Sequence, residues 1–122
     1  MSFYVTLTAE QNDFKGILKT QLVNYIRLRG EWEVGVYMCK MAHEDGIAWV
    51  LCSVADYSLV NEIPMQLLAI VDVKNLNNSK PMYVRVNKRT ISSINVEFRR
   101  NPSKEDLIGK TDIICVLHFR KA

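Results

Sequence analysis

A cysteine and a histidine stand three residues apart near the end of the chain, at Cys115 and His118. A thiol beside an imidazole base is a pair that nucleophilic catalysis uses. The surrounding run DIICVLHF is rich in β-branched and other apolar residues, which indicates a strand. Residues three apart in a strand point to opposite faces of the sheet, so we expect no catalytic pair here.

Two pairs of neighbouring carboxylates are the other candidates for acid–base chemistry. They are Glu31 with Glu33, and Glu105 with Asp106. Neither pair has a second feature that indicates a cleft, which glycosidase-type chemistry requires. The sequence also has no G-x-x-x-x-G-K-[ST] loop to hold phosphate. We therefore predict a protein that is not an enzyme and needs no cofactor.

The three cysteines, Cys39, Cys52 and Cys115, cannot all pair with one another, and none stands in a C-x-x-C spacing. Each lies within an apolar run, which predicts buried, reduced thiols in a cytosolic or nuclear protein. His43 and His118 are too scattered to form a zinc signature with them. No metal site is predicted.

Basic residues gather at Lys88-Arg89, at Arg99-Arg100 and at the end of the chain, while the formal net charge is only +3. One interpretation is that these residues are solvated strand ends. The other is that Lys88, Arg89, Arg99 and Arg100 contact nucleic acid or an acidic patch of a neighbouring subunit. The first two precede a predicted strand and the last two follow it, so we expect them about 30 Å apart, at opposite ends of the strand. No continuous nucleic-acid stripe is predicted, only a weak contact.

Strands must position these groups, because alternation of apolar and polar residues dominates the chain. The residues Ile94, Val96 and Phe98 alternate with polar neighbours, as in a half-buried antiparallel strand. Eight such runs can be laid out, and they centre on Tyr4, Leu22, Val34, Leu51, Ala69, Val84, Val96 and Val116. The run FKGILKTQLVNYI also nearly fits a helical period, and we favour a strand for its second half. The length of 122 residues suits one all-β domain, residues 1–122.

Two runs have unusual faces. In DIICVLHF, Ile114 and Val116 make the second face apolar too, which predicts a strand covered on both sides. In RLRGEWEVGV, we expect Gly30 to form a hairpin turn and Trp32 to point into the core. Gly35 then leaves a dent or a bulge on the opposite face, where another backbone can approach closely.

Turns and targeting signals complete the pattern. The segment Glu44-Asp45-Gly46 predicts a second hairpin turn, and NLNNSKP predicts a polar loop. No apolar run reaches the ~18 residues that a membrane-spanning helix needs, and no secretory signal is visible at the start.

Four segments resemble a known family: FYVTL, LRGEWEVGV, YVRVNKRTISSINVEFRR and GKTDIICVLHFR, in this order. The chain resembles the minor capsid (penton) proteins of Maverick/Polinton elements and related adintoviruses, which are virus-like DNA transposons that encode capsid proteins. The resemblance implies a single eight-stranded antiparallel jelly-roll β-sandwich. It further implies a homo-oligomer, a pentamer at icosahedral vertices, that meets a major capsid protein. Its location would be the virion, and the host cytoplasm or nucleus during assembly.

The residues on exposed alternate faces are candidates for subunit contacts, namely Glu33, Tyr37, Tyr83 and Arg85. Two other functions remain open. One is a stand-alone β-sandwich recognition module for a receptor, a glycan or a host protein, derived from a domesticated capsid protein. The other is binding of single-stranded nucleic acid, in which tyrosines stack on bases.

Overall fold

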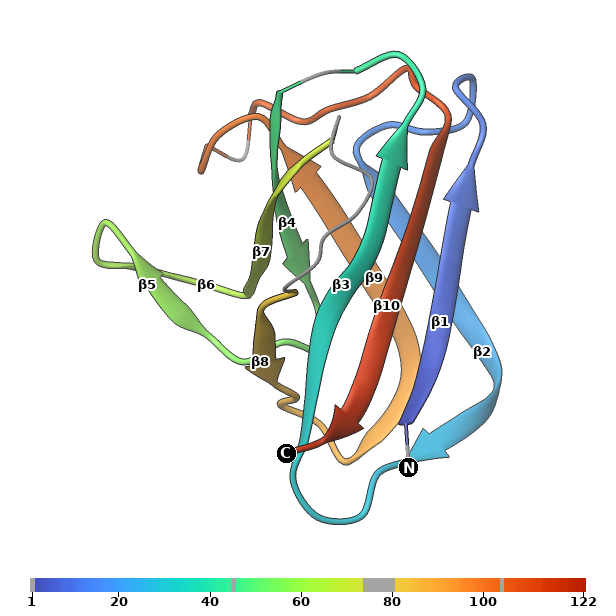
Figure 1. Cartoon of the computed structure of the whole chain (residues 1–122), viewed down its shortest axis with the longest axis vertical. Coiled ribbons are helices and arrows are strands. Elements are labelled where there is room, and N and C mark those ends of the chain that lie inside the picture. Colours follow the sequence, from blue (N-terminus) through green and yellow to red (C-terminus); the bar gives the residue numbers. More distant parts are fainter. Residues whose placement is uncertain (1, 45, 74–80, 104) are drawn as a thin grey trace.

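Two antiparallel four-stranded sheets pack face to face, and a two-stranded ribbon projects from one side (Figure 1). The structure is a computed structural model that describes residues 2–44, 46–73, 81–103 and 105–122. Within these ranges the chain forms ten strands: β1 (Ser2–Ala9), β2 (Ile17–Arg27), β3 (Trp32–Met41), β4 (Ile47–Cys52), β5 (Ser58–Val60), β6 (Ile63–Met65), β7 (Leu67–Asp72), β8 (Tyr83–Arg85), β9 (Thr90–Arg99) and β10 (Ile113–Lys121).

The strands pair in a nested order. The first sheet, sheet A, has the order β1-β10-β3-β8, and the second, sheet B, has the order β2-β9-β4-β7. Thus β1 pairs with β10, β2 with β9, β3 with β8, and β4 with β7. Apart from the ribbon of β5 and β6, the chain follows the path of one long hairpin whose two arms are rolled together.

The prediction of an all-β fold with antiparallel sheets is confirmed. Each of the eight predicted runs contains one strand of the two large sheets. The structure adds β5 and β6, so it has ten strands in three sheets where eight in two were expected. The helical alternative for residues 14–26 is wrong, because Lys15 and Gly16 form a bend and β2 begins at Ile17.

The core lies between the inner faces of the two sheets. Sheet A contributes Val34 and Leu117, and sheet B contributes Val50 and Val96, all fully buried. Aromatic rings pack in pairs: Phe3 stacks on Phe119, and Phe14 meets Phe98 edge to face; their ring centroids lie 4.8 and 5.7 Å apart. Burying a side chain of this size contributes roughly 1.5–3 kcal/mol relative to leaving it exposed.

Both predicted hairpin turns are wrong. Gly30 has a φ of +82° and Gly46 a φ of +90°, as turn glycines do. However, β2 and β3 lie in different sheets, as do β3 and β4, so both connections cross from one sheet to the other. Alternation identifies a strand, but it does not identify its partner. Asp45 and the loop residues 75–80 lie outside the described residues.

A β-bulge shifts the inner face of β3 halfway along its length. Val36 pairs with Leu117 and Met38 with Val116, so Tyr37 is an extra residue between them. Beyond the bulge Cys39 and Met41 face the core, and Met38 is only half-buried. The alternation that puts Trp32, Val34 and Val36 on the core side therefore ends at Val36.

All three cysteines are free and buried, as predicted. Cys39 lies opposite Cys115 across β3 and β10. The hydrogen bond with the Cys39 thiol, and then burial, raises the pKa of Cys115. Burial also raises the pKa of the Cys52 thiol to about 11.

We expect this burial to make the protein less stable in alkali. Above pH ~8.5 the unfolded chain loses the Cys52 proton, while the folded chain keeps it up to about pH 11. The folded state then binds more protons, so the free energy of unfolding falls as the pH rises, on the order of 2–3 kcal/mol for this group. Urea unfolding at pH 8 and pH 11 should show a smaller loss in Cys52→Ala. Parallel losses in both proteins would contradict the assignment to Cys52.

The described residues contain no helix that is long and apolar enough to cross a membrane.

Candidate functional site

A row of four residues crosses the outer face of sheet A, one residue from each strand. Tyr4 of β1 lies opposite His118 of β10, His118 opposite Gly35 of β3, and Gly35 opposite Tyr83 of β8. The four-stranded pairing therefore gathers three aromatic rings around one glycine, although they come from both ends and the middle of the sequence.

Gly35 leaves the space that the Tyr83 ring fills. A β-carbon added at Gly35 would lie 2.8 Å from the Met82 carbonyl oxygen and 3.1 Å from the Tyr83 ring. The dent predicted at this position is therefore real, and the backbone and side chain of β8 occupy it. Because the ring lies over the glycine, the Tyr83 hydroxyl reaches Nδ1 of His118 at 2.7 Å.

We expect Gly35→Ala to destabilise the protein by about 1–3 kcal/mol, because the added methyl group displaces Met82 or Tyr83. Gly109→Ala is the matched control, since its added carbon would meet nothing closer than 3.4 Å. Urea unfolding of both variants measures the difference. If the two substitutions lower the free energy of unfolding equally, the close approach at Gly35 does not contribute to stability.

His118 is held between aromatic rings. Tyr4 stacks on it with ring centroids 4.6 Å apart, and Tyr83 meets it nearly edge-on at 5.7 Å. Its second ring nitrogen, Nε2, is buried with no hydrogen-bond partner among the described residues. A buried polar atom without a partner costs about 1–3 kcal/mol. The stacking on Tyr4 and the hydrogen bond to Tyr83 offset this cost and hold the His118 ring in place.

A charged row runs beside the aromatic one. Arg120 of β10 donates to Glu33 of β3 at 2.6 Å, and its guanidinium carbon lies 3.4 Å from the centre of the Tyr83 ring. Arg85 of β8 pairs with Glu31 at 2.7 Å. The charges of Glu33 and Arg120 are thus satisfied within the subunit, while Tyr4 at the far end of the aromatic row is 55% exposed.

Of the four predicted contact residues, Glu33, Tyr83 and Arg85 lie together in these two rows. Tyr37 lies further along β3, at the bulge, where its ring meets Tyr4 at 5.1 Å and stays half exposed. The sequence did not single out Tyr4 or His118 as members of this surface. The alternation of FYVTL and DIICVLHF puts both on outer faces, but only the pairing of the first strand with the last brings them together.

The predicted cover over the second face of β10 is absent from the described subunit. Ile114 is 39% exposed, and Val116 is only partly buried. We call the outer surface of sheet A the aromatic face and define it by Tyr4, Tyr37, Tyr83, Ile114, Val116 and His118. It combines exposed apolar and aromatic groups on a rigid sheet.

A second apolar surface lies on the opposite side of the molecule. The ribbon of β5 and β6 and the outer face of sheet B enclose a groove of about 510 Å³. Leu59 and Ile63 on the ribbon are 71% and 55% exposed. We call this surface the ribbon groove; its apolar lining is Ile17, Leu51, Tyr57, Ile63, Pro64 and Met65.

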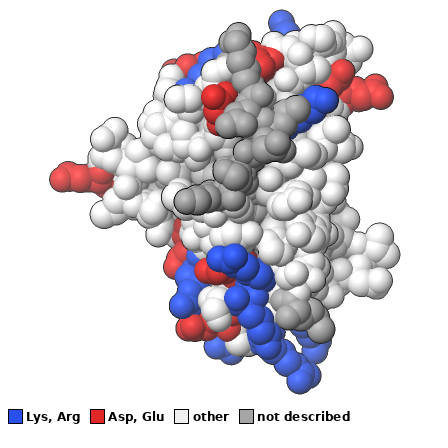
Figure 2. Space-filling view, viewed as in Figure 1, with Lys and Arg blue, Asp and Glu red and all other residues white. Residues whose placement is uncertain are grey.

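Basic side chains gather at the end of the molecule where both termini lie (Figures 1 and 2). Lys88 and Arg89 lie there in the β8–β9 connection and are exposed. Arg99 and Arg100 do not join them. Arg99 is 5% exposed and bonded to Glu97, and Arg100 pairs with Glu44 and Asp106 near the other end of β9.

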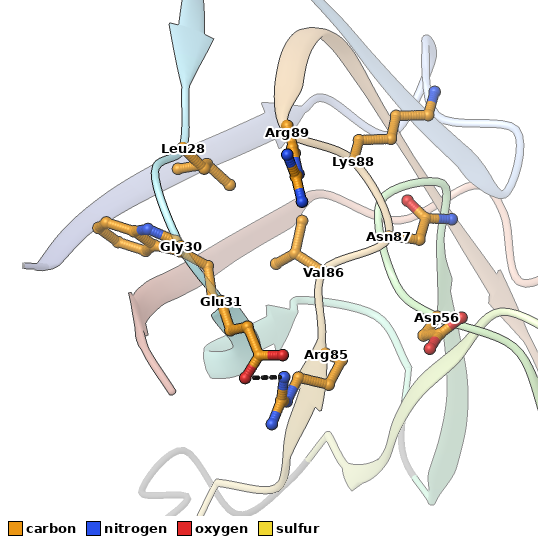
Figure 3. Close-up of a pocket in the computed structure, with 10 residues that line it drawn as sticks. Leu28, Gly30, Glu31, Asp56, Arg85, Val86, Asn87, Lys88 and Arg89 are labelled. Atoms are coloured by element: carbon orange, nitrogen blue, oxygen red, sulfur yellow. Dashed lines mark ion pairs between the residues drawn. The ribbon is translucent and has the colours of Figure 1, made fainter.

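A hollow of about 270 Å³ opens at the same end of the molecule (Figure 3). Leu28, Trp32 and Val86 form part of its lining, together with Arg85 and Arg89. The Trp32 indole donates to the carbonyl oxygen of Arg29 at 3.0 Å, so the ring is anchored and is not free to bind a ligand.

Cys115 and His118 point to opposite faces of β10, the thiol into the core and the imidazole into the aromatic row. Among the described residues, no group of three His, Cys, Asp or Glu side chains is arranged to hold a metal ion. Comparison of the chain with protein-family models, with curated proteins and with solved structures finds no match.

Proposed function

We propose that this protein is a structural subunit that assembles with copies of itself into a closed ring, as a penton-like minor capsid protein does. The aromatic face of one copy meets the ribbon groove of the next. The family resemblance of the sequence suggests the capsid of a Maverick/Polinton or adintovirus-type element as the setting.

The observation that carries this proposal is the open outer face of β10. Its sequence is that of a strand covered on both sides, yet Ile114, Val116 and the neighbouring Tyr4 and Tyr37 form an exposed apolar surface in the single subunit. Surfaces of this kind mark sites of association. A second copy supplies the missing cover.

The two apolar surfaces also differ in shape, which favours a ring. A ring needs a heterologous contact, in which each subunit offers two different patches, and the rotation between neighbours must close. The aromatic face is the outer surface of a sheet and carries three tyrosines, whereas the ribbon groove is a concave surface with a projecting arm. They lie on opposite sides of a rigid pair of sheets, so each copy can contact two neighbours.

The nested strand order supports a jelly roll as the architecture. In a jelly roll eight antiparallel strands form two sheets with Greek-key connections. The nested pairing of β1 to β4 with β7 to β10 is consistent with this arrangement, in which β5 and β6 would be an insertion between β4 and β7. Capsid subunits are one class of protein built on that scaffold.

The mass of the assembly in solution tests the proposal. Sedimentation or native mass spectrometry over a range of concentrations should show a ring, with a pentamer expected. Coexpression with a double jelly-roll major capsid protein should give particles that contain the subunit. A protein that stays monomeric at every concentration and is absent from particles would refute the proposal, and glycan or receptor binding by that monomer would favour the recognition module.

A further inference from the structure

The excess positive charge of the chain is concentrated at one end. Backbone hydrogen bonds join three segments there: Leu28 donates to Arg89 at 2.7 Å, Val86 to Trp32 at 2.9 Å, and Ala122 to Glu31 at 2.9 Å. These segments and their immediate neighbours carry seven basic residues: Arg27, Arg29, Arg85, Lys88, Arg89, Arg120 and Lys121. The acidic residues near them are Glu31, Glu33 and Asp56, so this end has a balance of +4 while the whole chain has +3.

Ion pairs neutralise only two of these cations. Arg85 pairs with Glu31, and Arg120 pairs with Glu33. The remaining five are exposed and have no acidic partner among the described residues; they are Arg27, Arg29, Lys88, Arg89 and Lys121. We call these five residues the basic end. Sequence reasoning identified Lys88 and Arg89, but not the convergence of the other three on them.

The chemistry of the basic end fits phosphate. Three of its members are arginines, whose planar guanidinium groups match phosphate oxygens in a bidentate geometry. The five cations come from three separate segments, which suits an extended polyanion better than one small ion. An acidic protein partner would also need an apolar anchor at the centre of its interface. Trp32 and Leu28, which line the hollow at this end, are buried and do not offer such an anchor.

We propose that the basic end binds the phosphate backbone of a nucleic acid without reading its sequence. This function goes beyond self-assembly and uses a different surface from the aromatic face and the ribbon groove. The net attraction comes from release of the counterions that surround the phosphates, so binding weakens steeply with salt.

Fluorescence anisotropy with a labelled oligonucleotide of about twenty nucleotides tests the proposal on the full chain. For single strands the logarithm of the binding constant should fall with the logarithm of salt concentration, with a slope of about −2 to −3.5 if three to five phosphates are contacted. Single-stranded and duplex DNA of several sequences should bind with similar affinity. A slope near zero, or a strong preference for one sequence, would overturn the proposal.

Charge reversal locates the site. Lys88→Glu with Arg89→Glu should weaken binding by at least about ten-fold near 100 mM salt and make the slope shallower. Lys15→Glu with Lys40→Glu is the matched control: the same change in net charge at exposed positions outside the basic end, expected to change binding less than about two-fold. Circular dichroism checks that both variants are folded. Equal weakening by the two variants would mean attraction to net charge alone and would refute a defined site.

Poly-glutamate of similar length distinguishes phosphate from carboxylate. It should bind more weakly than the oligonucleotide and should not displace it. If it binds as tightly, the basic end recognises acidic protein segments and the assignment to nucleic acid is wrong.

Discussion

A subunit with Tyr37→Asp is expected to fold normally and to remain monomeric. Tyr37 is half exposed and touches Tyr4, so its loss should change the free energy of unfolding by only about 1 kcal/mol. In the ring, however, the new carboxylate would lose its water against the apolar lining of the ribbon groove, and the Tyr37 ring would no longer pack there. The lost aromatic contact and the cost of burying a charge should together weaken association by at least about 100-fold.

The same reasoning predicts that Ile63→Asp in the ribbon groove is also monomeric. Each variant has lost one of its two contact surfaces and kept the other. A mixture of the two should therefore form a heterodimer, in which the intact aromatic face of the Ile63 variant meets the intact ribbon groove of the Tyr37 variant. This dimer cannot extend, because the outward surfaces are the altered ones. Sedimentation of each variant and of the mixture measures all three outcomes.

Val23→Asp is the matched control for both variants. Val23 is 98% exposed on β2 and does not line the ribbon groove, so the same kind of change should leave the assembly intact. An oligomer that tolerates Ile63→Asp but not Tyr37→Asp would indicate a contact between two aromatic faces, as in a two-fold dimer. That result would refute the heterologous ring.

The strands could be predicted from the sequence because alternation is a local property. Ile94, Val96 and Phe98 face the core as expected, and each predicted run contains a strand. Strand partners are not local. Gly30 and Gly46 have the positive φ of turn residues, yet both connections cross between sheets. Only the packing of both sheets around one core decides that the first strand pairs with the last.

In the candidate site, too, local features could be predicted from the sequence, and features that depend on strand pairing could not. The exposed face of Tyr37 and the dent at Gly35 follow from position in a strand, and both were predictable. That Tyr83 fills the dent and bonds to His118 depends on the register of three strands. The bulge at Tyr37 and the ribbon of β5 and β6 were equally invisible, since an extra residue or a short insertion does not disturb the overall pattern of alternation.

Arg99 is the residue whose environment differs most from its expected one. It ends an alternating strand beside a second arginine, a position that favours exposure, but the chain after β9 returns over it. Leu107 forms an isolated bridge with Arg99, and the Pro102 carbonyl oxygen accepts from its guanidinium at 3.0 Å. Glu97, two residues earlier on the same face, supplies the carboxylate that makes this burial tolerable.

Glu97→Ala is therefore expected to destabilise the protein strongly, by about 3 kcal/mol. Its removal leaves the Arg99 guanidinium, whose side chain is 6% exposed, without a counter-charge. Breaking a buried ion pair in this way costs about 3–5 kcal/mol, and the 26% exposure of Glu97 indicates the lower end of that range. Urea or thermal unfolding measures the loss.

A double-mutant cycle separates the lost pair from the lost packing. Arg99→Met keeps an apolar side chain of similar length beside Pro102 and Leu107, and the carboxylate that it leaves unpaired is 26% exposed and reaches water, so the substitution should cost only about 1–2 kcal/mol. Once Arg99 is methionine, Glu97→Ala should add little, so the double variant should be more stable than Glu97→Ala alone. If the two costs simply add, the carboxylate does not compensate the buried arginine. Pro102 and Leu107 would then hold their places by packing, independently of the charge beneath them.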